Sequence, residues 1–249
     1  MHLPPDPSVL PFHTHLQSIC DRGHPETRSS QRALSGHTPN PQVPSVGWTR
    51  LRSRTMTFID FHTHHPARTG EEALVQGQET WGIHPWHIPA DWNTLEPPTD
   101  ILAIGECGLD KVCKTPYPLQ KEVFLKHIGW SEEQRKPLLI HCVRALDDLL
   151  FLRHSKPVTQ PWIFHGFRGK PQQLNRLLQS GFYVSFGFRF NEESLRQCPL
   201  DRLLLESDDD ERPIRELYEQ VSVLLDLPME KLCQQMDAQY RLLFANHSD

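Results

Sequence analysis

Two histidines separated by a single residue close the apolar stretch Phe58–His64. Side chains alternate between the two faces of a β-strand, so Asp60, His62 and His64 are expected on one face and the residues between them on the other. Two imidazoles on one face at the end of a buried strand can chelate a metal ion. The alternative is a pair of surface histidines in a loop. Four later stretches of the chain favour the metal site over this alternative.

Four further apolar stretches lead to a polar residue in the same way. The residues at their ends are Glu106, His141, His165 and Asp208. Any one of them is explained by a polar side chain that caps a loop, but five strands that end alike predict a shared site. Three or four imidazoles with one or two carboxylates suit a divalent metal, zinc above all, and the carboxylates leave Mg²⁺ or Mn²⁺ open.

These residues must be positioned by strands that alternate with helices. The expected strands are Phe58–His62, Thr80–His84, Ile101–Glu106, Leu138–His141, Trp162–His165, Tyr183–Phe186 and Leu203–Glu206, with a short eighth at Ala73–Gln76. The expected helices are Gln120–Arg135, Ala145–Arg153, Pro171–Gln179, Glu192–Gln197, Ile214–Leu225 and Met229–Ala245. Such alternation is typical of βαβ units with parallel strands.

The predicted fold class is α/β, a compact TIM-like (β/α) barrel with its early part shortened, closed or incomplete. A parallel barrel brings the carboxyl ends of its strands to one face, where a shared site forms. Residues 66–72, which separate the expected strands Phe58–His62 and Ala73–Gln76, are too few for a helix. Residues 56–249 are also fewer than the ~250 that such a barrel usually takes.

Residues 1–55 differ from the rest in composition and charge. They contain Pro, Ser, His and Arg without apolar periodicity, and six Arg against three acidic residues give them a charge of +3. We expect a disordered extension or a mis-called start upstream of Met56, followed by one domain over residues 56–249. That domain has a charge of −8, so any contact with nucleic acid must come from a local site.

Compartment and partners follow from simpler features. The chain has no apolar run near the ~18 residues of a membrane span, so no membrane partner is expected. Its six cysteines include no C-x-x-C pair and no secretory signal precedes them, which predicts reduced thiols in a cytoplasmic protein. The oligomeric state is left open.

The ordered motifs of the chain resemble the TatD family of metal-dependent hydrolases, within the amidohydrolase-like barrels. The motifs are His62-Thr63-His64, Gly82-Ile83-His84-Pro85, Gly105-Glu106-Cys107-Gly108-Leu109-Asp110, Ile140-His141, Phe164-His165-Gly166-Phe167 and Glu206-Ser207-Asp208. The resemblance runs from about Phe58 to Phe244 and leaves residues 1–55 uncovered. Its most specific element is the G-E-x-G-L-D stretch.

The resemblance implies a hydrolase with one or two divalent ions (Zn, Mg or Mn), and a DNase or exonuclease is the usual assignment in the family. By matching position, the implied metal ligands are His62, His64, Glu106, His141, His165 and Asp208. Glu106 would bridge two ions, and Asp208 would accept a proton from the attacking water. Glu206 is expected deeper in the barrel, as a supporting carboxylate.

The chain departs from the family pattern where substrate would be held. Val143 stands where many members have Arg, with Arg144 one residue later, and Arg168 stands where Ser or Thr is usual. We expect Arg168, Arg144 and His84 to contact substrate, with Arg168 pairing with an anion. The last motif continues with Asp209-Asp210-Glu211, which would repel a polyanion unless these side chains face solvent.

Three functions remain open. The leading one is a phosphodiesterase or DNase acting on DNA or a small phosphodiester. The second is a metal-dependent amidohydrolase acting on an amide or ester of a small anionic substrate, which the acidic charge favours. The third is a non-catalytic metal-binding scaffold. Trp81, Trp86 and Trp92 could stack on a base, but three tryptophans near one loop are more typical of a core.

Overall fold

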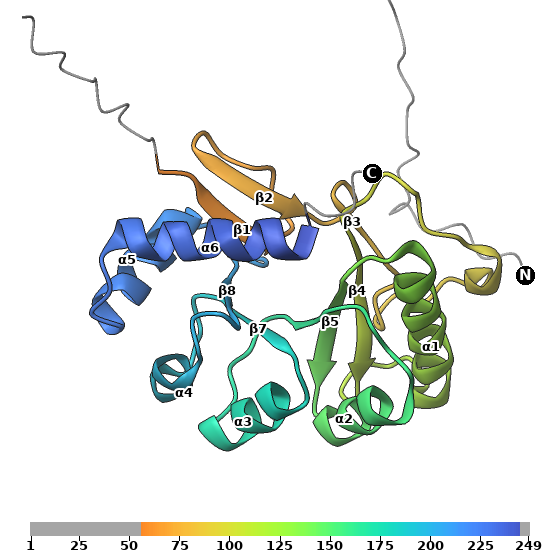
Figure 1. Ribbon diagram of the computed structural model, residues 1–249. Coiled ribbons are helices and arrows are strands. Elements are labelled where there is room, and N and C mark those ends of the chain that lie inside the picture. The colour runs from red at the N-terminus through yellow and green to blue at the C-terminus, as the bar shows by residue number, and fades with distance from the viewer. Residues whose placement is uncertain (1–55, 245–249) are drawn as a thin grey trace, which may run out of the picture. The chain divides into compact units, whose positions relative to one another are not determined.

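The computed structural model describes residues 56–244, which form eight strands and six α-helices (Figure 1). The strands are β1 Phe58–Thr63, β2 Glu71–Val75, β3 Thr80–Trp81, β4 Ala103–Asp110, β5 Leu138–Val143, β6 Trp162–Phe164, β7 Tyr183–Phe186 and β8 Leu203–Leu205. The helices are α1 Tyr117–Gln134, α2 Leu146–Ser155, α3 Pro171–Gln179, α4 Glu192–Gln197, α5 Ile214–Leu224 and α6 Met229–Phe244, with a short 3₁₀ helix, η1, at Trp92–Thr94. The extension or mis-called start expected at residues 1–55 lies outside the described residues.

The strands form a parallel barrel in chain order. Strands β3 to β8 make one six-stranded sheet, and β1 pairs with β2 in a second. Single parallel bridges, Gln76–Thr80 and Thr63–Asp208, join the two sheets at both ends. The ring therefore closes, and the predicted α/β TIM-like barrel is confirmed.

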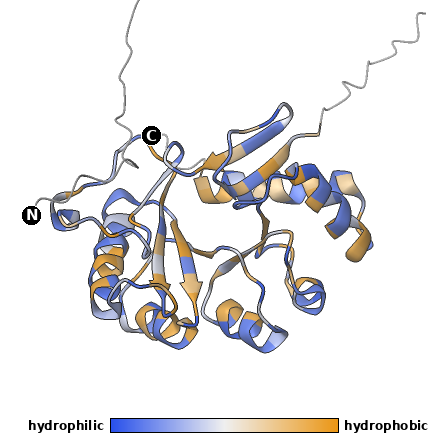
Figure 2. Cartoon of the chain, turned by 180° about the vertical axis from the view of Figure 1, so that it is seen from behind, coloured by the Kyte–Doolittle hydropathy of each residue, from blue (hydrophilic) through white to orange (hydrophobic). Residues whose placement is uncertain are grey.

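Apolar residues of the strands and helices fill the core. Trp162 is fully buried and packs edge-on against Phe124 of α1 and against Phe182. On α3, Leu174 and Leu177 lie one turn apart and are both fully buried. Figure 2 shows apolar and polar residues side by side on these helices, as expected for helices with one covered face. None of the helices between residues 56 and 244 is long and apolar enough to cross a membrane.

The early part of the barrel is reduced, as the sequence predicted. No helix separates β1 from β2, and only η1 lies between β3 and β4. The expected strand Thr80–His84 was wrong in its second half, because β3 ends at Trp81. The backbone N–H of Ile83 donates to Nε2 of His127 in α1 (2.8 Å) instead of to a neighbouring strand.

Strand β4 is longer than predicted and runs past Glu106 to Asp110. Two glycines allow this close approach to β5. Gly105 and Gly108 have φ angles of 143° and 145°, which disfavour other residues. A Cβ on Gly108 would lie 2.0 Å from the carbonyl oxygen of His141, so β5 could not pack there against any larger residue.

Candidate metal centre

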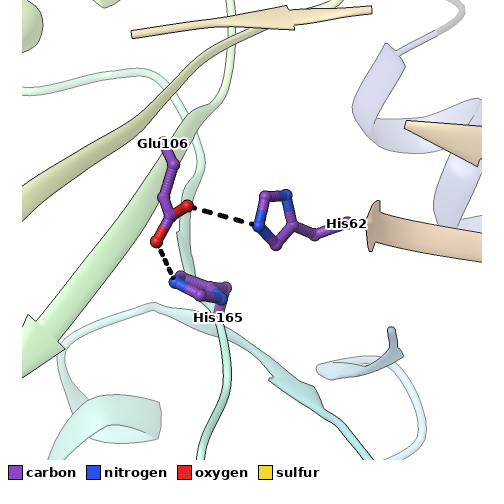
Figure 3. Close-up of side chains that lie close together, drawn as sticks. All are labelled: His62, Glu106 and His165. Carbon is purple, nitrogen blue, oxygen red and sulfur yellow. Dashed lines mark ion pairs between the residues drawn. The ribbon is translucent and has the colours of Figure 1, made fainter. Parts of the chain in front are cut away.

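The carboxylate of Glu106 lies at the centre of a cluster of imidazoles. Its Oε2 is 3.5 Å from Nε2 of both His62 and His64. Its Oε1 faces three more rings, at 2.8 Å from Nε2 of His165, 3.0 Å from Nδ1 of His141 and 3.2 Å from Nε2 of His84. Figure 3 shows Glu106 between His62 and His165, which come from different strand ends. One carboxylate thus joins two groups of histidines.

Asp208 completes the group on the β1 side. Its Oδ1 is 3.8 Å from Nε2 of His62 and 3.6 Å from Nε2 of His64. Its backbone N–H donates to the His62 carbonyl, and its own carbonyl accepts from the N–H of His64, both at 3.0 Å. The closure of the barrel therefore fixes Asp208 against the two histidines. Burial and the neighbouring charge of Glu206 raise the pKa of Asp208.

Two carboxylates stand behind the histidines and orient their rings. Asp110 Oδ2 lies 3.0 Å from Nε2 of His141, whose Nδ1 faces Glu106. Glu206 Oε1 lies 3.3 Å from Nδ1 of His165, whose Nε2 faces Glu106. A carboxylate on the far nitrogen of an imidazole fixes the tautomer and strengthens the other nitrogen as a metal ligand. The deeper, supporting position expected for Glu206 matches its full burial.

Asp60 does not join the cluster, although it shares a strand face with His62 in the predicted pattern. Its carboxylate accepts from the backbone N–H (2.9 Å) and the hydroxyl (2.6 Å) of Ser207, and burial raises its pKa to about 7. Ser207 also contacts the Thr63 hydroxyl at 2.8 Å. The register of β1 is irregular between Asp60 and Thr63, so strict alternation fails there. These bonds tie the residue before Asp208 to β1.

The charges of the cluster stabilise one another. Burial alone would raise the pKa of Glu106, but the charge of His165 and the hydrogen bonds from His141 and His165 outweigh it and lower the pKa. Burial likewise opposes protonation of His165, yet Glu106 and Glu206 raise its pKa well above the usual value. Without a metal ion the site therefore pairs an ionised Glu106 with a protonated His165, and a bound cation would take the place of that proton.

The residues fit a divalent metal ion. Among residues 56–244, neither ring nitrogen of the fully buried His62 has a hydrogen-bond partner, a costly arrangement unless something else occupies them. In the part of the chain that the structure describes, ligand atoms in four sets of three residues lie within 4.8 Å of one another. Two sets are centred on Glu106, with His62 and His165 or with His84 and His141. Imidazole and carboxylate donors in this proportion suit zinc and leave manganese or magnesium open.

The structure brings all six residues predicted as metal ligands together. It also places His84, expected to contact substrate, within the set around Glu106. Arg144 and Arg168 line a cavity of about 1040 Å³ beside the cluster, and Arg168 Nη2 is 3.9 Å from Asp208 Oδ2. The contact of Asp110 with His141 was not predicted, although Asp110 is the last residue of the G-E-x-G-L-D motif.

The expectation that three tryptophans form part of the core was wrong for one of them. Trp81 packs against His127 and Trp130, and Trp92 is partly buried. Trp86 is 55% exposed and lines the cavity. Its indole N–H donates to Asp110 Oδ2 at 2.7 Å, which holds it at the rim.

A closed parallel barrel with imidazoles and carboxylates at the carboxyl ends of its strands defines a class of metal-dependent hydrolases. Within that class the chain belongs to the TatD-related DNase family, whose model matches residues 13–245. The match reaches further upstream than the motifs predicted. It begins at His13, within Phe12–His15, which has the same sequence as Phe61–His64. Residues 12–15 lie outside the described residues.

Similar proteins agree with this assignment. An uncharacterized metal-dependent hydrolase of Escherichia coli K12, YcfH, is 31% identical over 191 residues, or 66% of this chain and 72% of that protein. The 3′-5′ ssDNA/RNA exonuclease TatD of Pantoea vagans is 28% identical over 172 residues, 59% of this chain and 63% of the relative. The crystal structure of YJJV, a TatD homologue from Escherichia coli K12, superposes with a TM-score of 0.67 over 77% of this chain and 99% of that one, at 20% identity. The chain is a metal-dependent hydrolase of the TatD family.

Proposed function

We propose that this hydrolase cleaves phosphodiester bonds, in DNA or in a smaller phosphodiester, with one or two divalent ions (Zn, Mg or Mn). The ligands in this proposal are His62, His64 and Asp208 on one side of Glu106 and His84, His141 and His165 on the other. The convergence of these residues on the two oxygens of one carboxylate supports a bridging role for Glu106.

The chain's own groups supply the remaining steps. Divalent ions held by these residues would lower the pKa of a bound water and supply positive charge to phosphate oxygens. Asp208 accepts the proton of the attacking water. Arg168, whose guanidinium is half exposed and 3.9 Å from Asp208, pairs with a non-bridging phosphate oxygen.

The observation that carries the proposal is the charge of the cavity. Four arginines line it, Arg144, Arg168, Arg176 and Arg189, and they balance four carboxylates, Glu106, Asp147, Asp208 and Asp209. Each divalent ion would add two positive charges to this balanced lining, and two ions would outweigh Asp110 and Glu206 behind it, within a domain whose charge is −8. A local cationic site of this kind attracts a phosphodiester.

The acidic partners of these arginines do not prevent this. Arg176 pairs with Asp147 and Arg189 pairs with Asp209, and all four side chains are at least half exposed. Exposed ion pairs contribute only ~0–1 kcal/mol, so a phosphate can replace the carboxylate. The name of the Pantoea vagans relative, an exonuclease for single-stranded DNA and RNA, supports the same substrate class.

The test is hydrolysis of a single-stranded oligodeoxynucleotide by metal-free protein supplied with Mg²⁺, Mn²⁺ or Zn²⁺. Replacing Arg168 by Ala should lower kcat/KM roughly ten- to hundred-fold, because a charge-assisted contact is worth ~1.5–3 kcal/mol. Arg168→Lys should recover little, since an ammonium lacks the guanidinium fork. Metal content should be unchanged in both variants.

Arg215→Ala is the matched control, because Arg215 is exposed on α5 and pairs with Glu219 away from the cavity. It should keep full activity. Full activity of Arg168→Ala would remove Arg168 from the site. A wild-type protein that hydrolyses amides or esters of small carboxylates but no phosphodiester would overturn the proposal.

A further inference from the structure

Trp86 is a large aromatic side chain held open at the rim of the cavity. It lies in the connection between β3 and β4, and its side chain is 55% exposed. Phe164 and Phe167 line the same cavity but are buried, so their rings offer little surface to a ligand. Trp86 therefore presents aromatic surface beside the metal centre.

The ring of Trp86 is fixed in place by the centre itself. Its indole N–H is committed to Asp110 Oδ2, and its backbone N–H donates to Nδ1 of His84 at 3.1 Å. The ring centroid lies 5.1 Å from that of His84 and 5.9 Å from that of His141, with the ring planes nearly perpendicular. Because the only polar atom of the ring is already bonded, what remains for a ligand is apolar π-surface.

The cationic residues follow strands farther along the ring from Trp86, and the last of them lies opposite it. In a closed ring of eight strands in chain order, the exit of β3 lies opposite that of β7. Trp86 follows β3, whereas Arg144, Arg168 and Arg189 follow β5, β6 and β7. A nucleotide has the complementary arrangement, with a planar base separated from its phosphate by a sugar.

We propose that Trp86 is a specificity-determining residue that stacks on an unpaired nucleobase next to the scissile phosphate. This inference rests on the proposed phosphodiesterase function. Stacking on an indole tolerates every base, because each has a π-face, but it requires a base that is not enclosed in a duplex. Trp86 then makes hydrolysis depend on the presence of a base as well as a phosphate.

The test compares two matched single-stranded oligonucleotides, one with all its bases and one with tetrahydrofuran abasic units at both of its ends. For the base-bearing substrate, Trp86→Leu should lower kcat/KM by about 5- to 150-fold, the range expected for loss of one aromatic–base stack. The abasic substrate should be affected less than two-fold. Trp86→Phe keeps an aromatic ring and loses the bond to Asp110, so it should retain most of the preference for bases.

Two controls separate stacking from a structural effect. Metal content should be the same in all variants, and Phe151→Leu, which changes an exposed aromatic residue on α2 that does not line the cavity, should leave both substrates unaffected. A loss that is equal for the two oligonucleotides, or as large in Trp86→Phe as in Trp86→Leu, would overturn the inference and assign Trp86 to the support of Asp110.

A binding measurement distinguishes this inference from the proposed function. Fluorescence anisotropy of labelled versions of the two oligonucleotides, with metal-free protein at low salt, reports base recognition without hydrolysis. Tighter binding of the base-bearing strand, lost in Trp86→Leu, is the expected result. If neither strand is hydrolysed, the proposed function fails; if the two strands bind equally, the stacking inference fails.

Discussion

Replacing His127 tests whether this residue is a buried, neutral imidazole that holds the connection after β3. His127 lies on α1 and is fully buried, where Nδ1 donates to the Val123 carbonyl at 2.7 Å and Nε2 accepts from the backbone N–H of Ile83 at 2.8 Å. Only a neutral imidazole can accept that bond. Since Ile83 precedes His84, the bond holds the start of the connection that carries His84 and Trp86.

The magnitude follows from the pKa of the buried ring. Burial lowers the pKa of His127 from 6.5 to about 4. Above pH 6.5 the ring is neutral in both states and its contribution to stability is complete. Between pH 6.5 and about pH 4, His127 is protonated in the unfolded chain but neutral in the folded protein. Its contribution to the free energy of unfolding is therefore lost over that interval. It amounts to about 3 kcal/mol in all and about 2 kcal/mol by pH 5.

The assay is urea unfolding of the wild type and His127→Gln at pH 7 and pH 5, with a chelator present so that metal release does not contribute. Glutamine can donate and accept hydrogen bonds but does not titrate here. The free energy of unfolding should fall by about 2 kcal/mol more in the wild type than in the variant, because the other titrating groups are common to both proteins. Equal falls in the two proteins would refute a neutral, buried His127.

Three further changes test other parts of the structure. Asp110→Asn should weaken metal binding about ten- to hundred-fold by calorimetry, because the carboxylate behind His141 is lost; an unchanged affinity would show that Asp110 does not orient that ring. Trp162→Ala should lower the free energy of unfolding by about 3–5 kcal/mol, since the indole is fully buried, and a loss under ~1 kcal/mol would place it outside the core. Tyr218→Phe should cost about 1–3 kcal/mol in denaturant unfolding, because the hydroxyl bonds both the N–H and the carbonyl of Ile59; no measurable change would mean that water replaces the hydroxyl.

The sequence predicted the parts of the fold that carry a local signal. Helix α3 agrees with its prediction from end to end because Pro171 fits the first helical position and Leu174 and Leu177 mark its buried face. Helix α4 agrees because Asn191 accepts from the N–H of Ser194 as an N-cap. The six predicted ligands converge because each ends or follows an apolar strand, and a parallel barrel gathers those ends.

The parts that could not be predicted depend on contacts between distant residues. Strand β3 stops early because Ile83 bonds to His127, 44 positions away. Asp110 reaches His141 because β4 continues past Glu106 along β5, which the glycines permit. Trp86 is exposed because its indole bonds to Asp110 at the cavity rim, a contact that no local pattern indicates. The cytoplasmic location expected from the cysteines stays a prediction.

Glu106 faces five imidazoles and joins them into one candidate metal centre. The most direct test is elemental analysis of the wild type and Glu106→Gln after equilibration with Zn²⁺, Mn²⁺ or Mg²⁺ and removal of free ion. Glutamine preserves the size of the side chain but removes the charge that faces five imidazoles. The wild type should retain one or two ions per chain of at least one of these metals, and the variant should lose most of them while remaining folded. A wild type that retains none, or a variant that retains as much as the wild type, would contradict the account.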